Sequence, residues 1–260
     1  MFKKGIDVSK WQGTVDWEKV KAAGIEFAML RAGYGQGNID PQFVRSADEC
    51  TRLGIPFGVY WFSYAYTTEM ATQEAKFCID AVSKYRLSYP VAFDFEYDSV
   101  DYASEQGVAV TKELASAMAR AFCSTVEDNG YYPMIYANPN YLSAYFDRDL
   151  PMEYDIWLAQ WPRNPDPAQE PAQAGGMWQY TSSGTVAGIS GRVDLDAAYK
   201  DYPALIGQSG NGNTGDDSYA NEAARAREWV IEQGISDGSR PNDPATRQEV
   251  WVMLYRLEGN

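Results

Sequence analysis

The 260-residue sequence contains no histidine, only three cysteines and few basic residues. Without histidine the chain cannot form a Ser-His-Asp or Cys-His nucleophile, and it lacks the commonest zinc ligand. The odd number and wide spacing of Cys50, Cys78 and Cys123 suit neither a disulfide framework nor a zinc cluster, so we expect buried, reduced thiols. We therefore expect no metal and no cofactor, and any hydrolytic chemistry must depend on carboxylates.

Positive charge is scarce: 22 Lys and Arg stand against 36 Asp and Glu, which gives a formal net charge of -14 and a pI near 4.4. Binding to nucleic acid depends on basic side chains that displace counterions from phosphates, so we exclude a nucleic acid partner. The first residues, MFKKGID, lead into an expected strand without an apolar run of signal-peptide length, and no later segment is long enough to span a bilayer. We expect a chain that is made in the cytoplasm and does not insert into a membrane.

Short apolar runs alternate with longer amphipathic runs from residue 5 to about residue 200. Gly24, Gly54 and Gly130 mark points where a helix ends and a strand follows, and this β-α-β alternation requires parallel strands. The pattern predicts an α/β fold, an incomplete (β/α) barrel of the TIM type with eight strands and about five helices. The expected strands cover residues 5–8, 26–31, 57–62, 91–95, 132–136, 156–160, 177–180 and 192–195, and the expected helices cover residues 16–23, 41–53, 68–85, 109–129 and 139–146.

The composition changes after the expected barrel, which we assign to residues 1–207. Residues 208–215 read QSGNGNTG, a composition typical of a flexible linker. Residues 216–260 are acidic and show two helical stretches, so we predict a small helical C-terminal module there.

Two acidic side chains end a hydrophobic strand in the segment PVAFDFE, residues 90–96. Alternate residues of a strand point the same way, so Asp94 and Glu96 share one face and the intervening phenylalanine lies on the other. Catalytic groups of a parallel barrel lie at the C-terminal ends of its strands, and Asp7 and Asp194 occupy such positions in GIDVS and RVDL. If the barrel closes, these four carboxylates face one cavity.

Glycosidic bonds are cleaved by two carboxyl groups, of which one donates a proton to the leaving oxygen and the other supports the developing cation. Crowding of acids in a partly dry cleft raises at least one pKa and keeps a proton on one acid near neutral pH. Glu96 has the longer side chain, and we predict that it is the general acid, supported by Asp94, Asp7 and Asp194. The alternative for each acid taken alone is a helix cap or a solvent-facing group.

Aromatic residues make up 14% of the chain, and many of them follow the ends of expected strands. Sugars stack on aromatic faces, whereas aromatics inside a barrel chiefly fill volume, so both interpretations apply within this set. The aromatic residues that we expect to contact a glycan substrate are Tyr34, Tyr60, Tyr64, Trp178 and Tyr180.

The segment GIDVSKWQG, residues 5–13, resembles the opening of the glycoside hydrolase family 25 muramidases, the Chalaropsis-type lysozymes. Four further segments agree in order and spacing: LRAG at 30–33, GVY at 58–60, DFE at 94–96, and WQY at 178–180 followed by VD at 193–194. The resemblance covers about residues 4–200. It implies cleavage of the β-1,4 bond between N-acetylmuramic acid and N-acetylglucosamine in bacterial peptidoglycan, with Glu96 as the proton donor and the three aspartates as supporting acids. Trp61 departs from the pattern, because relatives often carry histidine there, and this bears on substrate preference.

Residues 234–249 resemble a single S-layer homology motif, a family whose motifs bind cell-wall polysaccharide. The match implies that Arg247 is the binding arginine, and a guanidinium suits an anionic sugar substituent. Such motifs usually come in threes, so the resemblance implies either self-association of chains or a vestigial module. The alternative is that Arg247 only forms a surface ion pair beside Glu249.

Two other functions fit the same features: a barrel that binds cell-wall glycan without cutting it, and a glycosidase for another amino-sugar polymer such as chitin. Four convergent acids argue against binding alone, because their desolvation is costly. Residues two apart on a strand are about 6.6 to 6.8 Å apart at Cα, which is compatible with either a retaining or an inverting reaction. We hypothesise that the substrate's own 2-acetamido oxygen attacks the anomeric carbon, which gives a retaining reaction.

The expected place of action is the bacterial cell wall, whereas the expected place of synthesis is the cytoplasm. Release through a membrane lesion, as for phage endolysins, and non-classical export of a bacterial autolysin are both compatible with this sequence. Both routes remain open at this point.

Overall fold

A computed structural model describes residues 2–208 and residue 229 of the chain. The chain divides into two units, residues 1–213 and 214–260, and the fold described below belongs to the first. The predicted linker beyond residue 208 and the predicted C-terminal module with Arg247 lie outside the described residues, apart from Trp229.

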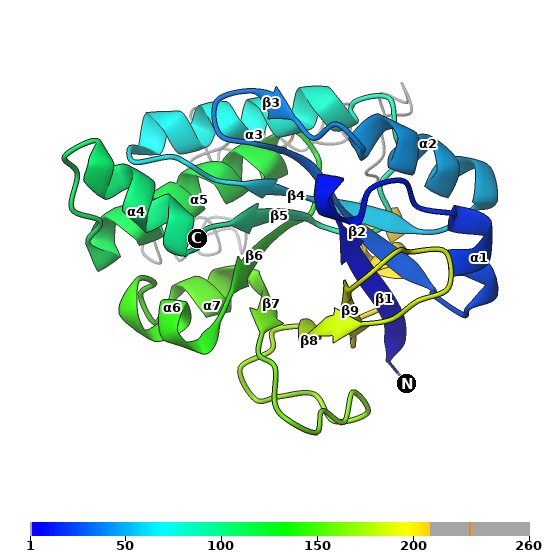
Figure 1. The fold of residues 1–260 in the computed structure, drawn as a ribbon. Coiled ribbons are helices and arrows are strands. Elements are labelled where there is room, and N and C mark those ends of the chain that lie inside the picture. The colour runs from blue at the N-terminus through cyan, green and yellow to red at the C-terminus, as the bar shows by residue number, and fades with distance from the viewer. Residues whose placement is uncertain (1, 209–228, 230–260) are drawn as a thin grey trace. The chain divides into compact units, whose positions relative to one another are not determined.

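Within residues 2–208, nine strands form a single sheet that closes on itself (Figure 1). The sheet order is β1-β9-β8-β7-β6-β5-β4-β2-β3, and an additional pairing of β1 with β2 closes an eight-stranded barrel with β3 as an appended edge. The predicted α/β barrel with eight strands is confirmed. The strands are β1 (Lys3–Val8), β2 (Phe27–Tyr34), β3 (Asn38–Ile39), β4 (Phe57–Phe62), β5 (Val91–Asp94), β6 (Pro133–Ala137), β7 (Asp155–Ala159), β8 (Met177–Gly184) and β9 (Val193–Ala198).

The last barrel strand differs from the prediction, because β9 runs antiparallel to both of its neighbours, β8 and β1. The expectation of an all-parallel barrel is therefore wrong at this strand. Only residues 185–192 connect β8 to β9, and so short a connection cannot make the crossover that a parallel pair requires. Asp194 consequently lies near the start of β9, and the reversed direction brings it opposite Asp7, near the end of β1.

Helices surround part of the barrel, whereas β8 and β9 are flanked by loops (Figure 1). The expected helices correspond to α1, α2, α3, α5 and α6, while α4, α7 and α8 were not predicted. The pattern of α4 is weak because its buried residues are only Ser99 and Ala103. None of the helices in the described part is both long and apolar enough to cross a membrane. The helices are the 3-10 helix η1 (Lys10–Gln12), α1 (Trp17–Ala22), α2 (Phe43–Leu53), α3 (Thr68–Val82), α4 (Tyr97–Glu105), α5 (Lys112–Asp128), α6 (Pro139–Ala144), α7 (Leu150–Glu153) and α8 (Tyr202–Gln208).

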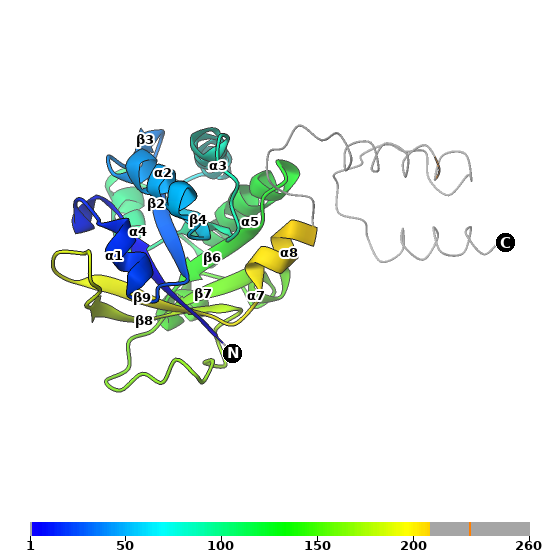
Figure 2. The same ribbon diagram turned by 90° about the vertical axis from the view of Figure 1, so that its right-hand side faces the viewer.

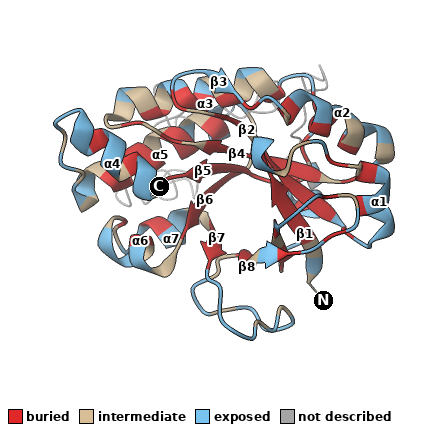
Figure 3. Cartoon of the chain, in the orientation of Figure 1, coloured by how far each residue is buried: buried red, intermediate tan, exposed pale blue. Residues whose placement is uncertain are grey.

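Most residues of the eight barrel strands are buried, as their red colour in Figure 3 shows. These strands separate two hydrophobic cores. The outer core lies between the barrel and its helices, whereas the inner core fills the barrel itself. Tyr202 of α8 belongs to the inner core, and its hydroxyl donates to Asp155 Oδ2 at 3.0 Å, at the first residue of β7. Figure 2 shows α8 beside the barrel strands. Packed side chains thus fill the end where the parallel strands begin, and a ligand must enter at their C-terminal ends. The inner core contains Phe27, Met29, Tyr60, Tyr89, Ala92, Met134, Tyr136, Trp157, Ala159, Met177, Ala198, Tyr202 and Ile206.

Gly5 of β1 leaves the space that the inner core requires, because a Cβ atom at this position would lie 2.2 Å from Phe27 Cζ. We predict that Gly5→Ala lowers the free energy of unfolding by about 1–3 kcal/mol, since the buried Phe27 ring must shift. Guanidinium denaturation followed by tryptophan fluorescence measures this change. Gly207→Ala is the control, because a Cβ atom there meets nothing within 4 Å. Equal stability of the two variants would contradict the packing argument.

Candidate active site

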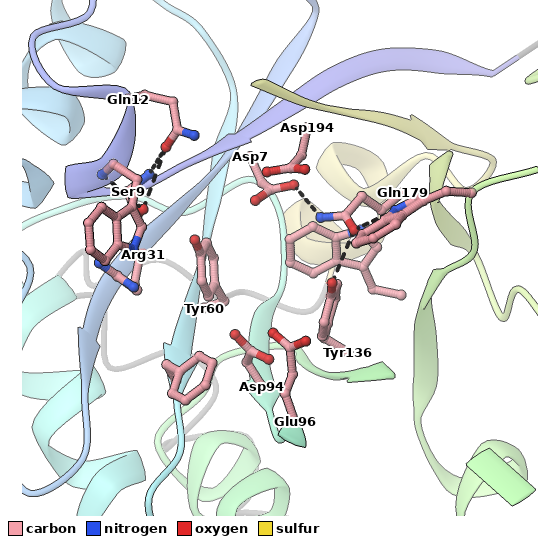
Figure 4. Close-up of a pocket in the computed structure, with 14 residues that line it drawn as sticks. Asp7, Ser9, Gln12, Arg31, Tyr60, Asp94, Glu96, Tyr136, Gln179 and Asp194 are labelled. Carbon is pink, nitrogen blue, oxygen red and sulfur yellow. Dashed lines mark hydrogen bonds between the residues drawn. The ribbon is translucent and has the colours of Figure 1, made fainter. Parts of the chain in front are cut away.

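A cavity of about 270 Å³ lies at the C-terminal ends of the parallel barrel strands (Figure 4). Its walls are polar, and Arg31 is the cationic side chain among its described lining residues. A hollow of this size suits one sugar ring with its substituents. The lining residues are Asp7, Ser9, Trp11, Gln12, Arg31, Tyr60, Phe62, Asp94, Glu96, Tyr136, Trp157, Trp161, Gln179 and Asp194.

β5 and the start of α4 deliver Asp94 and Glu96 to this cavity. Phe93 and Phe95 point to the outer core, where their rings stack with centroids 5.9 Å apart, so the acids between and after them face inward. The backbone N–H of Glu96 donates to Ser99 Oγ at 3.0 Å, which fixes this residue at the beginning of α4. Figure 4 shows the two carboxyl groups side by side.

Asp94 and Glu96 form a proton-sharing pair. Burial raises the pKa of Asp94 well above its usual range, and the charge of Glu96 and a hydrogen bond with it add to this effect. Burial also raises the pKa of Glu96 to about 6, although the hydrogen bond with Asp94 opposes the increase. Asp94 Oδ1 is buried without a hydrogen-bond partner among the described residues, which disfavours the charged form of this carboxyl group. The pair therefore retains a proton near neutral pH.

A second group of acids comes from β1 and β9 and faces the first group across the cavity (Figure 4). Asp7 and Asp194 are direct partners in the antiparallel ladder, and Asp196 lies two residues further along β9. Burial, then the charges of Asp196 and Asp194, raise the pKa of Asp7 well above its usual range. Burial raises the pKa of Asp194 to about 6. The raised pKa values mean that the carboxyl groups of this second group do not all carry a negative charge at the same time.

Asp196 was missed from the sequence, although it is fully buried. Trp157 Nε1 donates to Asp196 Oδ1 at 2.8 Å, and burial raises the pKa of this carboxyl group well above its usual range. The available signal was the alternation VDLD at residues 193–196, which repeats the spacing of the Asp94 and Glu96 pair.

Gln179 of β8 orients Asp7 through a network of side-chain hydrogen bonds. Its Nε2 donates to Asp7 Oδ2 at 2.7 Å, and its Oε1 accepts from Tyr136 OH at 3.0 Å and from Trp161 Nε1 at 3.1 Å. The donor and acceptor ends of the amide are therefore both engaged, and the carboxyl group of Asp7 has a defined orientation.

Arg31 is held against the cavity wall by Asp40. Its Nε donates to Asp40 Oδ2 at 2.8 Å and its guanidinium completes an ion pair at 2.7 Å, with only 11% of the arginine side chain exposed. Asp40 also accepts the backbone N–H groups of Lys10 at 3.0 Å and Gln42 at 2.9 Å. This buried aspartate thus joins β2 to η1 and to the residue before α2.

The structure brings the four predicted acids, Asp7, Asp94, Glu96 and Asp194, to one cavity, together with Tyr60. The predicted substrate-binding residues Tyr34 and Tyr64 lie beside it and line an adjacent hollow of about 170 Å³.

Trp178 and Tyr180 were expected in the groove, and this expectation is corrected. Both side chains are buried in the outer core, and Trp178 Nε1 donates to Gln160 O at 2.8 Å. On β8 the residues that face the barrel interior are Met177 and Gln179, so the alternate positions point away from the cavity.

Two tryptophans that were not predicted as substrate contacts flank the cavity. Trp11 of η1 is 76% exposed and Trp161, after β7, is 55% exposed. Large exposed aromatic faces beside a polar cavity are suited to stacking on sugar rings. Trp11 stands inside the GIDVSKWQG segment and Trp161 just beyond an expected strand, and these positions were the available signals.

The described residues contain no group of three or more His, Cys, Asp or Glu side chains arranged to hold a metal ion. Cys50, Cys78 and Cys123 are free and buried, and burial raises the pKa of each thiol. The chemistry that this site supports is proton transfer between carboxyl groups and a bound molecule.

A closed barrel whose open end gathers carboxyl groups around a sugar-sized cavity, with exposed aromatic rings at its edge, defines the class of glycoside hydrolases. Comparison with known proteins identifies the family. The model of Glycosyl hydrolases family 25 matches residues 6–189, and the chain belongs to this family.

Three proteins illustrate the similarity. The uncharacterized protein YegX of Escherichia coli strain K12 is 28% identical over 202 residues, which cover 74% of this chain and 68% of YegX. Lysozyme M1 of Streptomyces globisporus is 26% identical over 198 residues, covering 74% of this chain and 66% of that protein.

The third is a solved structure, the modular autolysin LytC of Streptococcus pneumoniae. It superposes with a TM-score of 0.65 and 28% identity over 76% of this chain and 47% of LytC, so this chain spans about half of that protein's length. A second LytC structure, with a TM-score of 0.64, is a complex with a synthetic peptidoglycan ligand.

The raised pKa of Glu96 predicts a pH-dependent stability. Its folded-state pKa of about 6 lies above the ordinary value of 4.5, so the folded protein binds more protons than the unfolded chain between these values. The free energy of unfolding must therefore fall as the pH rises through this window, and Glu96→Gln should remove about 1–2 kcal/mol of that fall. Urea denaturation at pH 4.5, 6 and 7.5 measures it. Glu105→Gln, at the exposed end of α4, is the control, and identical profiles for both variants would rule out a buried Glu96 proton.

Proposed function

We propose that the protein is an N-acetylmuramidase that hydrolyses the β-1,4 bond between N-acetylmuramic acid and N-acetylglucosamine in bacterial peptidoglycan. The observation that carries this proposal is the buried Asp94 and Glu96 pair, which retains a proton at the wall of a sugar-sized cavity. Membership of glycosyl hydrolase family 25 and the peptidoglycan ligand bound by LytC support this substrate class.

In the proposed first step, Glu96 donates its proton to the glycosidic oxygen while the bond from that oxygen to the anomeric carbon breaks. The acetamido oxygen of the N-acetylmuramic acid residue attacks the same carbon and forms a cyclic, positively charged intermediate. The proton of the pair must lie on Glu96 for this step, which leaves Asp94 anionic. The charge that develops on the sugar favours that arrangement, because it stabilises the buried Asp94 anion.

In the second step, water attacks the anomeric carbon while the bond from that carbon to the acetamido oxygen breaks, and Glu96 accepts a proton of the water, which regenerates the acid. The two substitutions at one carbon restore the original configuration, so the reaction is retaining. Asp7 and Asp194 face the pair from the opposite wall, where they support the positive charge of the intermediate. Gln179 keeps Asp7 in place for this role.

The proposed function places the action of the protein at the bacterial cell wall. We propose that the chain reaches it either by release through a membrane lesion, in the manner of phage endolysins, or by non-classical export. We also propose that residues 216–260 act as an S-layer-homology-like module that binds cell-wall polysaccharide through Arg247 or assembles chains into an oligomer.

Replacement of the proton donor tests the enzymatic role. We expect Glu96→Gln to reduce the release of reducing ends from purified peptidoglycan by about 100-fold to 10,000-fold, because the leaving oxygen loses its acid. Circular dichroism and thermal unfolding should show that the variant stays folded.

Glu105→Gln is the matched control and should retain the activity of the unchanged protein. Binding of the Glu96→Gln variant to insoluble cell walls should persist. If the unchanged protein binds walls but releases no reducing ends, the chain is a glycan-binding protein and the enzymatic proposal is wrong. Release from chitin but not from peptidoglycan would point to the other amino-sugar substrate.

The stereochemistry tests the participation of the acetamido group. An anomer-resolved NMR time course should show the β anomer of the new reducing end first, because two displacements at the anomeric carbon retain its configuration. The α anomer should then grow in by mutarotation. First appearance of the α anomer would instead require direct attack by water.

A further inference from the structure

A second hollow, of about 170 Å³, lies beside the candidate active-site cavity. Trp11, Arg31 and Phe62 line both hollows, so the two hollows adjoin and one ligand can occupy both. We call the second hollow the lysine pocket, after its most prominent charged group. The lysine pocket is lined by Lys10, Trp11, Arg31, Tyr34, Phe62, Tyr64 and Asp98.

Lys10 is held over this pocket by two aromatic rings. Its Nζ lies 4.8 Å from the centroid of the Trp11 ring and 5.6 Å from that of Tyr34, within the range of cation–π attraction. Its backbone N–H donates to the buried Asp40, which anchors the main chain at the same point. Lys10 is exposed, and the two rings and the anchored main chain favour a position of its ammonium group over the pocket.

The charge of Lys10 is not neutralised by an ion pair among the described residues. Arg31, the other cation of the pocket, is already paired with Asp40 at 2.7 Å. Asp98 is the anion that faces the same hollow, on the first turn of α4. Lys10 is thus the cation of this pocket that has no ion pair among the described residues.

The acids of the neighbouring active-site cavity make a nearby cation favourable for binding a negatively charged substrate. Asp7, Asp94, Glu96 and Asp194 line this cavity, so the ionised members of this set repel a substrate carboxylate unless a positive charge lies close to that carboxylate. N-acetylmuramic acid carries a lactyl ether that ends in a carboxyl group, free or joined to a peptide, whereas N-acetylglucosamine has none. The available cation beside the acids suits this substituent.

We propose that the lysine pocket binds the carboxylate-bearing substituent of the substrate and that Lys10 determines specificity for it. This inference rests on the proposed muramidase function and adds a recognition site to it. Lys10 makes the enzyme favour muramic-acid glycans that carry a free carboxylate over chemically neutral amino-sugar polymers. It takes no part in the bond-breaking step.

The test compares two glycan substrates that differ only in this charge: peptidoglycan strands freed of peptide, with lactyl carboxylates, and the same strands with the carboxylates converted to methylamides. Binding is measured by calorimetry in the Glu96→Gln background, so that no cleavage interferes. Hydrolysis of both substrates is measured with Glu96 intact. The variants are Lys10→Met, Lys10→Arg and, as the matched control, Lys76→Met on the exposed surface of α3.

We expect Lys10→Met to weaken binding of the carboxylate strands about fivefold and to change binding of the methylamide strands less than twofold. Lys10→Arg should restore most of the loss, and Lys76→Met should have no effect. KM for the carboxylate strands should rise by a similar factor, with kcat nearly unchanged.

Equal effects of Lys10→Met on both substrates, or no effect on either, would overturn the proposed recognition. Failure of the muramidase proposal gives a different result: neither substrate is hydrolysed by the protein with Glu96 intact. Selective loss of carboxylate binding on Lys10→Met would still support the lysine pocket in that case, because the calorimetric measurement requires no cleavage.

Discussion

The constraint on which the rest of this structure depends is the crowding of carboxyl groups inside a barrel that offers them almost no positive charge. Asp7, Asp94 and Asp196 are buried, and Glu96 and Asp194 stand close by, while Arg31 is already paired with Asp40. Such a set can remain folded only if some of its members keep their protons. The features that make the site costly to fold therefore also supply the proton that a glycosidase needs.

The surrounding fold is arranged to hold these acids apart in two groups. β5 and the start of α4 present Asp94 and Glu96, and antiparallel β1 and β9 present the other group, while the aromatic inner core fills the barrel beneath them. Gln179 and Trp157 donate hydrogen bonds to Asp7 and Asp196 and so limit the movement of their carboxyl groups. Rigid strands thus set the separation between the groups, and the polar partners set the orientation within them.

The sequence pattern predicted the barrel and the meeting of four acids. Both predictions need only short stretches of sequence, because residues alternate between the faces of a strand and barrel active sites lie at strand ends. The sequence-based prediction failed for features that depend on contacts between segments far apart in the chain. The direction of β9 follows from a short connection, and the orientation of Trp178 follows from which face of β8 turns inward. An aromatic-polar-aromatic triplet resembles a sugar platform, yet near the acids it is the polar Gln179 that faces the cavity. The sequence carried only weak signals for Asp196, Trp11 and Trp161, and their part in the site follows from their tertiary neighbours.

The antiparallel pairing of β9 with β1 affects how the domain folds during its synthesis. β1 is the first strand of the chain and β9 is the last of the barrel, so the ladder that sets Asp7 opposite Asp194 joins the two ends of this domain. During synthesis, β1 can pair with β9 only after almost the whole domain has left the ribosome. Contacts between residues so far apart in the sequence form slowly. The acidic centre is therefore assembled late, and a truncated chain retains an open sheet edge in its place.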